Sequence, residues 1–142
     1  IDLCWRLKNL GYKIMYCPDA EIYNVGGGTL ATDNPYKTYL NFRNNLIILQ
    51  KNLPLSDAYF RIFIRFFMDF IAWIHFIMEG KIDFAMAVTK AHIHFFKNFW
   101  NNAKKRTDSQ KPFMQHAGQY RSSIVYAYFI RKVKYFSELF ID

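Results

Sequence analysis

Cysteine and charged residues are both scarce in this chain, and each shortage excludes a class of protein. The only cysteines among the 142 residues are Cys4 and Cys17. Two cysteines cannot build the disulfide framework of a small secreted domain, and their spacing matches no zinc-binding pattern. We therefore expect both to be reduced, structural cysteines of a cytoplasmic protein.

The chain begins without an initiator methionine and without a polar or signal-like lead-in. Asp2 stands in the first turn of a predicted helix, which Gly11 ends. Leu3, Leu7 and Leu10 share one face of this helix. A helix that begins at the first residue suggests that the chain is a piece of a longer one.

The composition indicates one modest folded domain with an anionic partner. Apolar residues make up 52% and charged residues 21%, which excludes a disordered tail. Residues 1–80 carry eight Lys/Arg against seven Asp/Glu, whereas residues 81–142 carry eleven against four, so the net charge of +8 is almost wholly C-terminal. Such a basic half, rich in Phe and Tyr, favours phospholipid headgroups, a lipid-linked phosphate or nucleic acid.

Two short strands are predicted after the first helix. Lys13–Cys17 and Glu21–Val25 have strand-like composition and are separated by a Pro-Asp turn. Three consecutive glycines, Gly26, Gly27 and Gly28, then interrupt all regular structure.

A strong helix is predicted over residues 34–53. Pro35 fits the first helical position, and Pro54 ends the helix. Apolar side chains recur between them at helical spacing, at Tyr39, Phe42, Leu46, Leu49 and Leu53.

A third predicted helix is capped by Ser56 or Asp57 and reaches about position 78. Its charged residues Arg61, Arg65 and Asp69 stand four apart and form one narrow stripe on an otherwise Phe/Ile/Met-rich cylinder. About 34 Å of helix is enough to cross a bilayer, but a charged stripe argues against a helix that faces lipid all round. A helix buried on most of its surface and a helix lying flat in the membrane interface both fit.

The rest of the chain contains a fourth predicted helix and a C-terminal apolar run. The helix covers Ile82–Asn101 after a break at Gly80, and a polar linker follows over Asn102–Ser123. The run Ile124–Ile130 fits the helical and strand periods equally well, so its conformation stays open.

Five short motifs of the first fifty residues carry a resemblance in their order and spacing. They are Asp2–Arg6 (DLCWR), Gly11–Lys13 (GYK), Tyr16–Pro18 (YCP), Ala20–Thr29 (AEIYNVGGGT) and Asn34–Asn44, which begins Asn-Pro and ends Arg-Asn. Each motif alone is weak. Together they resemble the C-terminal part of the catalytic domain in family 2 glycosyltransferases of the GT-A fold, above all bacterial members that act on lipid-linked or polysaccharide acceptors.

The resemblance implies an α+β, mostly α fold in three parts. Residues 1–54 would end the catalytic domain with a helix and two short strands. Residues 55–101 would form an amphipathic helical hairpin that is membrane-proximal or oligomerising. Residues 102–142 would form a basic linker and a C-terminal apolar segment.

The implied activity is inverting, hexosyltransferase-like transfer from a nucleotide-sugar donor to a lipid-linked or glycan acceptor. In the family a Glu-Asp pair usually precedes the position of Ile1, its Asp being the proposed base, and an Asp-x-Asp metal site lies further upstream. We therefore expect a divalent metal, Mg or Mn, in the full enzyme. We expect no cofactor and no activity in this fragment alone.

The resemblance places Asp2 as a second acid near the proposed base, with Trp5 and Arg6 in the same motif. Inverting transfer needs a carboxylate that deprotonates the acceptor hydroxyl and cationic help for the departing diphosphate. Two alternatives stay open from the residues themselves. Asp2 could be a first-turn acid that stabilises the helix dipole, and Trp5 could be plain core.

Asn24 stands where relatives usually have a metal-binding His. An amide oxygen binds Mn²⁺ more weakly than an imidazole does, so a hydrogen-bonding or turn role is favoured for Asn24. Gly26, Gly27 and Gly28, with Thr29, could let backbone amides approach a diphosphate or could form a mobile loop.

Arg43 and Asn44 correspond to an Arg-Asn pair that faces the active site in relatives. A guanidinium suits a phosphate because its planar fork gives two charge-assisted bonds, and Lys37 is a weaker candidate for the same role. The alternative for all three is a solvated helix face. Structural roles are expected for the histidines His75, His92, His94 and His116.

An alternative function is a membrane-surface or oligomerisation module without catalysis. Phe-rich helices with basic rims bind anionic membranes, and a large apolar face also suits a homo-oligomer. The expected location is cytoplasmic, peripheral to the inner face of the plasma membrane. Nucleic-acid binding ranks last because no recognition-module signature is present.

Overall fold

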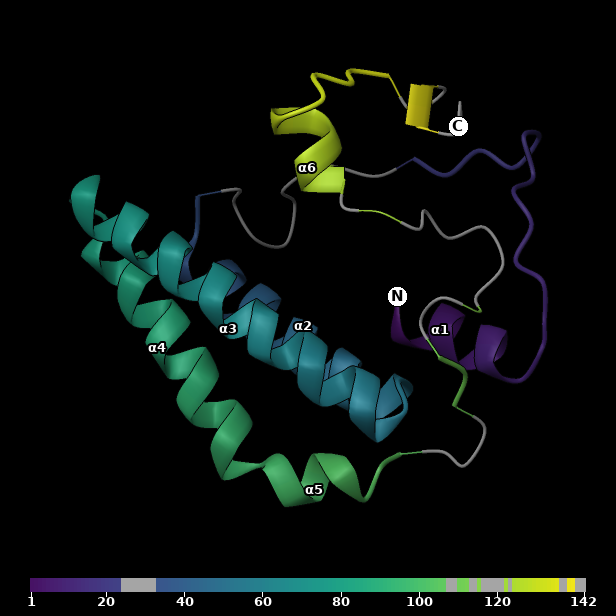
Figure 1. Ribbon diagram of the computed structural model, residues 1–142, viewed down its shortest axis with the longest axis horizontal. Helices are drawn as coiled ribbons and strands as arrows, with labels where there is room; N and C mark the ends of the chain where they lie inside the picture. The colour runs from purple at the N-terminus through teal and green to yellow at the C-terminus, as the bar shows by residue number, and fades with distance from the viewer. Residues whose placement is uncertain are drawn as a thin grey trace.

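The computed structural model describes residues 1–23, 33–106, 110–112, 115, 122, 124–135 and 138–139. Across these residues the regular elements are α-helices, and no strand is formed (Figure 1). The helices are α1 Asp2–Asn9, α2 Pro35–Asn52, α3 Leu55–Met78, α4 Ile82–Lys97, α5 Phe99–Ala103 and α6 Ile124–Phe129. The protein is therefore rich in helix, as expected.

The two predicted strands are wrong in the part of the chain that the structure describes. Residues 12–17 and 21–23 have no regular structure, and Met15 and Tyr16 are 81% and 86% exposed. A short β segment is stable only when its backbone pairs with a neighbour and one face is covered. The backbone hydrogen bonds found here are local turns, such as that from Ala20 N to Cys17 O at 3.3 Å.

Helix α1 ends at Asn9, and Gly11 terminates it, as predicted. Gly11 has φ of 92°, and the amides of Gly11 and Tyr12 donate to Lys8 O and Leu7 O at 3.0 Å each. These two bonds form a Schellman turn, which requires the left-handed backbone that glycine adopts without strain. The predicted apolar face of α1 is not covered, however, since Leu3 and Leu10 are 59% and 62% exposed.

Helix α2 confirms the prediction for residues 34–53. The side-chain oxygen of Asn34 accepts a hydrogen bond of 2.8 Å from Tyr36 N, and Pro35 occupies the first helical position. Leu53 is buried directly after the helix, ahead of Pro54.

Helices α2, α3 and α4 pack together around one core (Figure 1). Its centre consists of Leu46, Ile62 and Phe95, one from each helix and each less than 7% exposed. Helix α2 belongs to the first predicted part, residues 1–54, and the α3–α4 hairpin to the second, residues 55–101. The two parts thus share one core. The short helix α5 extends this core through Phe99.

The start of α3, the division between α4 and α5 and the conformation of the last apolar run were not predicted from the sequence. Helix α3 begins at Leu55 with Pro54 at the cap position, two and three residues before the predicted caps Ser56 and Asp57, and no side chain caps it. The predicted helix Ile82–Asn101 is divided at Asn98, whose amide group donates to His94 O at 3.0 Å and so competes with the helical ladder. The apolar run Ile124–Ile130, whose conformation the sequence left open, forms helix α6 over most of its length.

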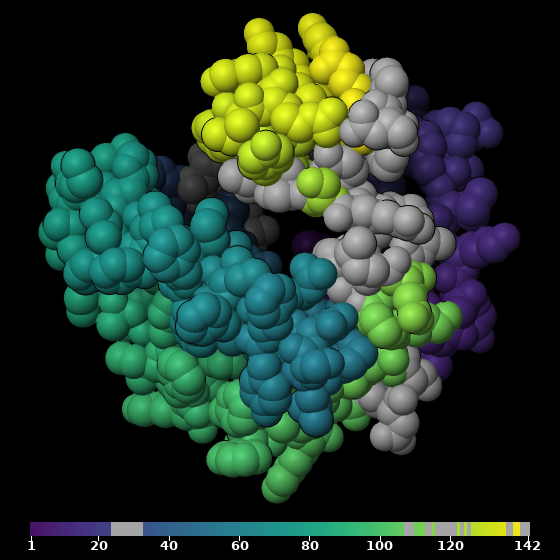
Figure 2. Space-filling view, in the orientation of Figure 1, coloured from purple at the N-terminus to yellow at the C-terminus, as the bar shows by residue number. Residues whose placement is uncertain are grey.

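The outer face of α3 is apolar and uncovered, and α3 crosses the near face of the molecule in Figure 2. Phe60, Phe63, Phe67 and Phe70 are 66%, 74%, 62% and 55% exposed. Among the described helices, none combines the length and the hydropathy that a membrane crossing requires.

Candidate functional site

The carboxylate of Asp2 is held at the C-terminal end of α2. Its oxygens lie 3.0 Å from Lys51 Nζ, 2.9 Å from Asn52 Nδ2 and 3.2 Å from Arg6 Nε. Partial burial disfavours the charged form, but the hydrogen bonds and the two cations outweigh it and lower the pKa of Asp2 below its ordinary value of 3.8. The geometry fixes α1 on α2, and the lowered pKa makes Asp2 a weaker base than a free carboxylate.

The same end of α2 is closed by side chains from far along the chain. The amide of Asn9 donates to Asn52 O at 3.0 Å, Gln110 Nε2 donates to Lys51 O at 2.9 Å, and Arg106 donates to both Gln50 O and Leu53 O. Burial lowers the pKa of Arg106. These four carbonyls are the groups that a helix leaves without partners at its C-terminus.

No sequence pattern predicts this cap, because its donors are 43 to 59 residues away from their acceptors. Cations near a helix C-terminus also interact favourably with the helix dipole, which accounts for Lys51 and Arg106 at this place. We conclude that Asp2 and Arg6 belong to a structural junction between α1 and α2. Trp5 is half-buried in the same helix.

Arg43 and Asn44 lie near the middle of α2 in a separate network. Arg43 Nε and Nη2 donate to Asn44 Oδ1 at 3.0 and 2.9 Å, and Nη1 donates to the Tyr39 hydroxyl at 3.3 Å. The Tyr39 hydroxyl also lies 3.0 Å from His94 Nδ1 on α4. This network fixes the guanidinium and links α2 to α4.

The structure therefore separates the predicted site residues into two groups. Arg43 precedes Lys51 by eight residues, which corresponds to about 12 Å along the helix axis. Lys37 lies one and a half turns before Arg43, half-buried, and has no ion pair or hydrogen bond with any described residue. Asn24 and the glycine run with Thr29 lie outside the described residues.

A hollow of about 390 Å³ lies between the beginning of α2 and α4. Tyr36 and Tyr39 of α2 and Asp83 and Lys90 of α4 contribute its aromatic and charged groups, and Pro35, Met86 and Ala87 complete the lining. Sequence analysis did not single out Tyr36, Asp83 or Lys90. Each pair has helical spacing, three residues for Tyr36 and Tyr39 and seven for Asp83 and Lys90, but only the fold brings the two helices together.

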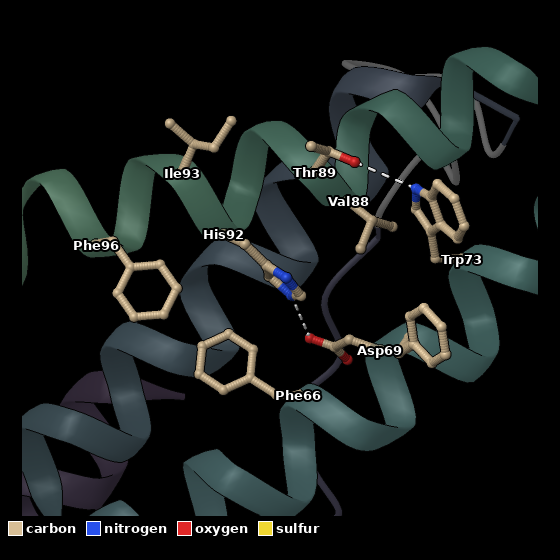
Figure 3. Close-up of a pocket in the computed structure, with 9 residues that line it drawn as sticks. Phe66, Asp69, Trp73, Val88, Thr89, His92, Ile93 and Phe96 are labelled. Atoms are coloured by element: carbon tan, nitrogen blue, oxygen red, sulfur yellow. Dashed lines mark hydrogen bonds and ion pairs between the residues drawn. The ribbon is translucent and has the colours of Figure 1, made fainter.

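A second hollow, of about 400 Å³, lies in the groove between α3 and α4 (Figure 3). Asp69 and His92 point toward each other across it, with 3.0 Å between Asp69 Oδ2 and His92 Nε2. On the other side of the carboxylate, Arg65 Nε is 2.7 Å from Asp69 Oδ1, in an ion pair rather than a well-aligned hydrogen bond. Asp69 is only 1% exposed.

Two further contacts bind Arg65 and His92 to aromatic rings. The Arg65 guanidinium lies over the Phe42 ring at 5.4 Å, and Phe66 packs edge-on against His92 at 4.9 Å. Arg65 and Asp69 of the predicted charged stripe thus contact α2 and α4, and Arg61 is half-buried. For this face of α3, a buried helix is therefore favoured over a helix that lies in the membrane interface. The opposite face of α3 is exposed.

Aromatic side chains form the walls of the α3–α4 groove. Trp73 Nε1 donates to Thr89 Oγ1 at 3.2 Å, and that hydroxyl donates to Ala85 O at 3.2 Å (Figure 3). Asp69, His92, Trp73 and Thr89 are thus all engaged with protein groups. The groove offers a ligand no unpaired polar group from these residues, which indicates a structural role.

No group of three or more His, Cys, Asp or Glu side chains that could hold a metal occurs among the residues described. His92 and His94 have different partners, Asp69 and Tyr39, as expected from their spacing of two on a helix. Cys4 and Cys17 are free and exposed. The metal implied by the resemblance therefore finds no ligand set in this part of the chain.

Comparisons of the chain with known protein families, with curated proteins and with solved structures find no match.

Proposed function

We propose that this chain is the acceptor-side, membrane-proximal part of an inverting glycosyltransferase that moves a sugar from a nucleotide-sugar to a lipid-linked or polysaccharide acceptor. The observation that carries the proposal is the ordered set of motifs over residues 2–44, which resembles family 2 enzymes of the GT-A fold. The donor site, the metal and the base would belong to a longer chain. The 142 residues alone would then transfer no sugar.

The position of Arg43 supports a role in binding the departing diphosphate. Three of its nitrogen atoms are engaged by the neutral oxygens of Asn44 and Tyr39. A phosphate carries a negative charge that the Asn44 amide oxygen lacks and can accept two parallel bonds from a guanidinium, so an anion can displace the Asn44 amide. Tyr39 would still hold the guanidinium from the other side.

The test uses a longer natural chain that contains these residues and compares Arg43→Lys and Arg43→Ala with the unaltered protein. Loss of one transition-state donor lowers kcat by about 10²- to 10³-fold. We expect losses of this order for Arg43→Ala and incomplete rescue by Arg43→Lys, because an ammonium cannot form the bidentate contact. Lys97→Ala, an exposed cation on α4, is the matched control and should have wild-type kcat.

Two outcomes would contradict the proposal. One is sugar transfer by the isolated 142 residues, which would place base and donor site within them. The other is unaltered turnover in Arg43→Ala, which would exclude the role of Arg43 in binding the departing diphosphate.

The exposed phenylalanines of α3 favour a second candidate function, binding to an anionic membrane surface without catalysis. Buried apolar area and basic residues both contribute to such binding, the latter by about 1 kcal/mol each near the surface.

Flotation with liposomes that contain anionic lipid tests this second candidate function. We expect Phe63→Ser with Phe67→Ser to abolish recovery with the vesicles and Ile22→Ser, at a 90% exposed position elsewhere, to leave it unaltered. Equal recovery with purely zwitterionic vesicles would contradict the electrostatic contribution.

A further inference from the structure

We infer that the hollow between the beginning of α2 and α4 binds a neutral saccharide ring. The inference rests on the proposed function, since it assigns the acceptor sugar to a particular place beside Arg43. It is drawn from an aromatic platform, from two opposite charges that have no partner among the described residues, and from the size of the hollow.

The aromatic platform is the ring of Tyr36, with the ring of Tyr39 stacked behind it. Their rings are stacked with 5.8 Å between centroids and 26° between planes, and Tyr36 is 57% exposed. The Tyr39 hydroxyl lies 3.0 Å from His94 Nδ1 and 3.3 Å from Arg43 Nη1, and the Arg43 guanidinium lies over the Tyr39 ring at 5.1 Å, so Tyr39 supports Tyr36 from behind. A rigid, partly exposed aromatic face suits the C–H face of a pyranose, because the ring face carries negative charge density and the C–H groups are weakly positive.

The charged groups of the hollow are Asp83 and Lys90. They stand seven residues apart on α4, two turns, and so share one side of the helix. Both are exposed, and neither has an ion pair or hydrogen bond with a residue that the structure describes. A carboxylate accepts hydrogen bonds and an ammonium donates them, which together match the hydroxyl groups of a sugar.

The opposite signs of these two groups select against charged ligands. A phosphate bound to Lys90 would be repelled by Asp83, and an amine bound to Asp83 would be repelled by Lys90. A neutral polyol meets no like charge. The hollow therefore favours an uncharged sugar over the diphosphate that Arg43 is proposed to bind nearby.

The apolar floor and the volume agree with a small ligand. Pro35, Met86 and Ala87 supply apolar surface, and the volume of about 390 Å³ falls in the lower part of the range for small-molecule sites, about 300–1,000 Å³. Such sites combine an apolar lining with a few polar groups that fix the orientation of the ligand.

Binding can be measured on the 142-residue chain itself by NMR titration with methyl pyranosides, with inorganic phosphate and tetramethylammonium as charged probes. We expect saturable shifts for at least one pyranoside and weaker binding of both ions. Tyr36→Ala should weaken pyranoside binding about tenfold, as loss of an aromatic contact of about 1.4 kcal/mol predicts. Asp83→Asn should also weaken it, whereas Tyr12→Ala, at a 63% exposed position outside the hollow, should not.

The titration separates this inference from the proposed function. Absence of saturable pyranoside binding, or equal effects of Tyr36→Ala and Tyr12→Ala, would overturn the saccharide site whether or not a longer chain transfers sugar. Pyranoside binding that depends on Tyr36, combined with no sugar transfer by a longer chain that contains these residues, would support the saccharide site and refute the transferase.

Discussion

Asp69 of α3 and His92 of α4 join the two arms of the helical hairpin through a contact of 3.0 Å, and the carboxylate has almost no exposure to solvent. Arg65 is a second partner at 2.7 Å. The buried negative charge of Asp69 is thus compensated by a cation of the same helix, α3, while the carboxylate is hydrogen-bonded to His92 of α4. This arrangement lies within an otherwise aromatic contact and fixes which face of α3 turns inward.

Replacement of Asp69 by Ala should destabilise the protein by about 3–5 kcal/mol, because Arg65 would be left partly buried without its counter-charge. Urea unfolding measures the change, with Asp19→Ala in an exposed turn as control. The double variant Arg65→Met with Asp69→Leu removes both charges and should lie much closer to the unaltered protein. A double variant as unstable as Asp69→Ala would refute the explanation by an uncompensated charge.

The contact of Asp2 with Lys51 and Asn52 should make stability depend on acid pH. The pKa of Asp2 is lowered in the folded protein, so its contribution is fully present above the ordinary value of 3.8 and is lost as the pH falls through the lower folded pKa. Asp2→Asn should therefore be less stable than the unaltered protein at neutral pH, and the difference should vanish in acid. Unfolding free energies measured from pH 7 down to pH 2 test this. A difference that grows toward acid would contradict the sign.

Arg106→Ala should destabilise the junction at the end of α2 by about 2–3 kcal/mol, since two carbonyls lose a charged donor. Arg106→Lys should recover only part of this loss because one ammonium cannot span both Gln50 O and Leu53 O as the fork does. Chemical denaturation measures the loss, and Lys105→Ala, an exposed neighbour, serves as control. Equal stabilities of the Arg106 and Lys105 variants would exclude the capping role.

Gly80→Ala should cost about 1 kcal/mol. Gly80 has φ of 72° in the turn between α3 and α4, where an added Cβ would contact nothing within 4 Å, so the cost comes from the left-handed backbone alone. Gly80→Asn should cost less, because asparagine tolerates this conformation better. Thermal unfolding distinguishes the two variants, and equal melting temperatures for Ala and Asn would contradict this cause.

Local patterns predicted the helices well where the signal lay within the helix itself. The Asn-Pro start and the apolar spacing of α2 and the glycines that follow α1 and α3 act over one or two turns, so the chain alone specifies them. The strand prediction for Lys13–Cys17 failed because a strand also needs a partner strand, which periodicity does not reveal.

The candidate sites depend on contacts that span the chain, and these were harder to predict. The four-residue spacing of Arg65 and Asp69 revealed a charged stripe, but the direction of the stripe depends on His92, 23 residues further on. The resemblance points to Arg43. The sequence pattern marks its partner Tyr39 only as an apolar helix position and predicts a structural role for His94. Their shared network becomes visible only when α2 and α4 lie side by side.

The closure of α2 by Asn9, Arg106 and Gln110 has a consequence for the order in which the molecule assembles. Arg106 and Gln110 stand 53 to 59 residues from their acceptors and can meet them only after the hairpin of α3 and α4 has collapsed onto α2. The contact of Asn9 with Asn52 closes a separate loop of 43 residues, and long loops close late. The last turn of α2 should therefore fray in early intermediates, and attachment of α1 should be among the final events of folding.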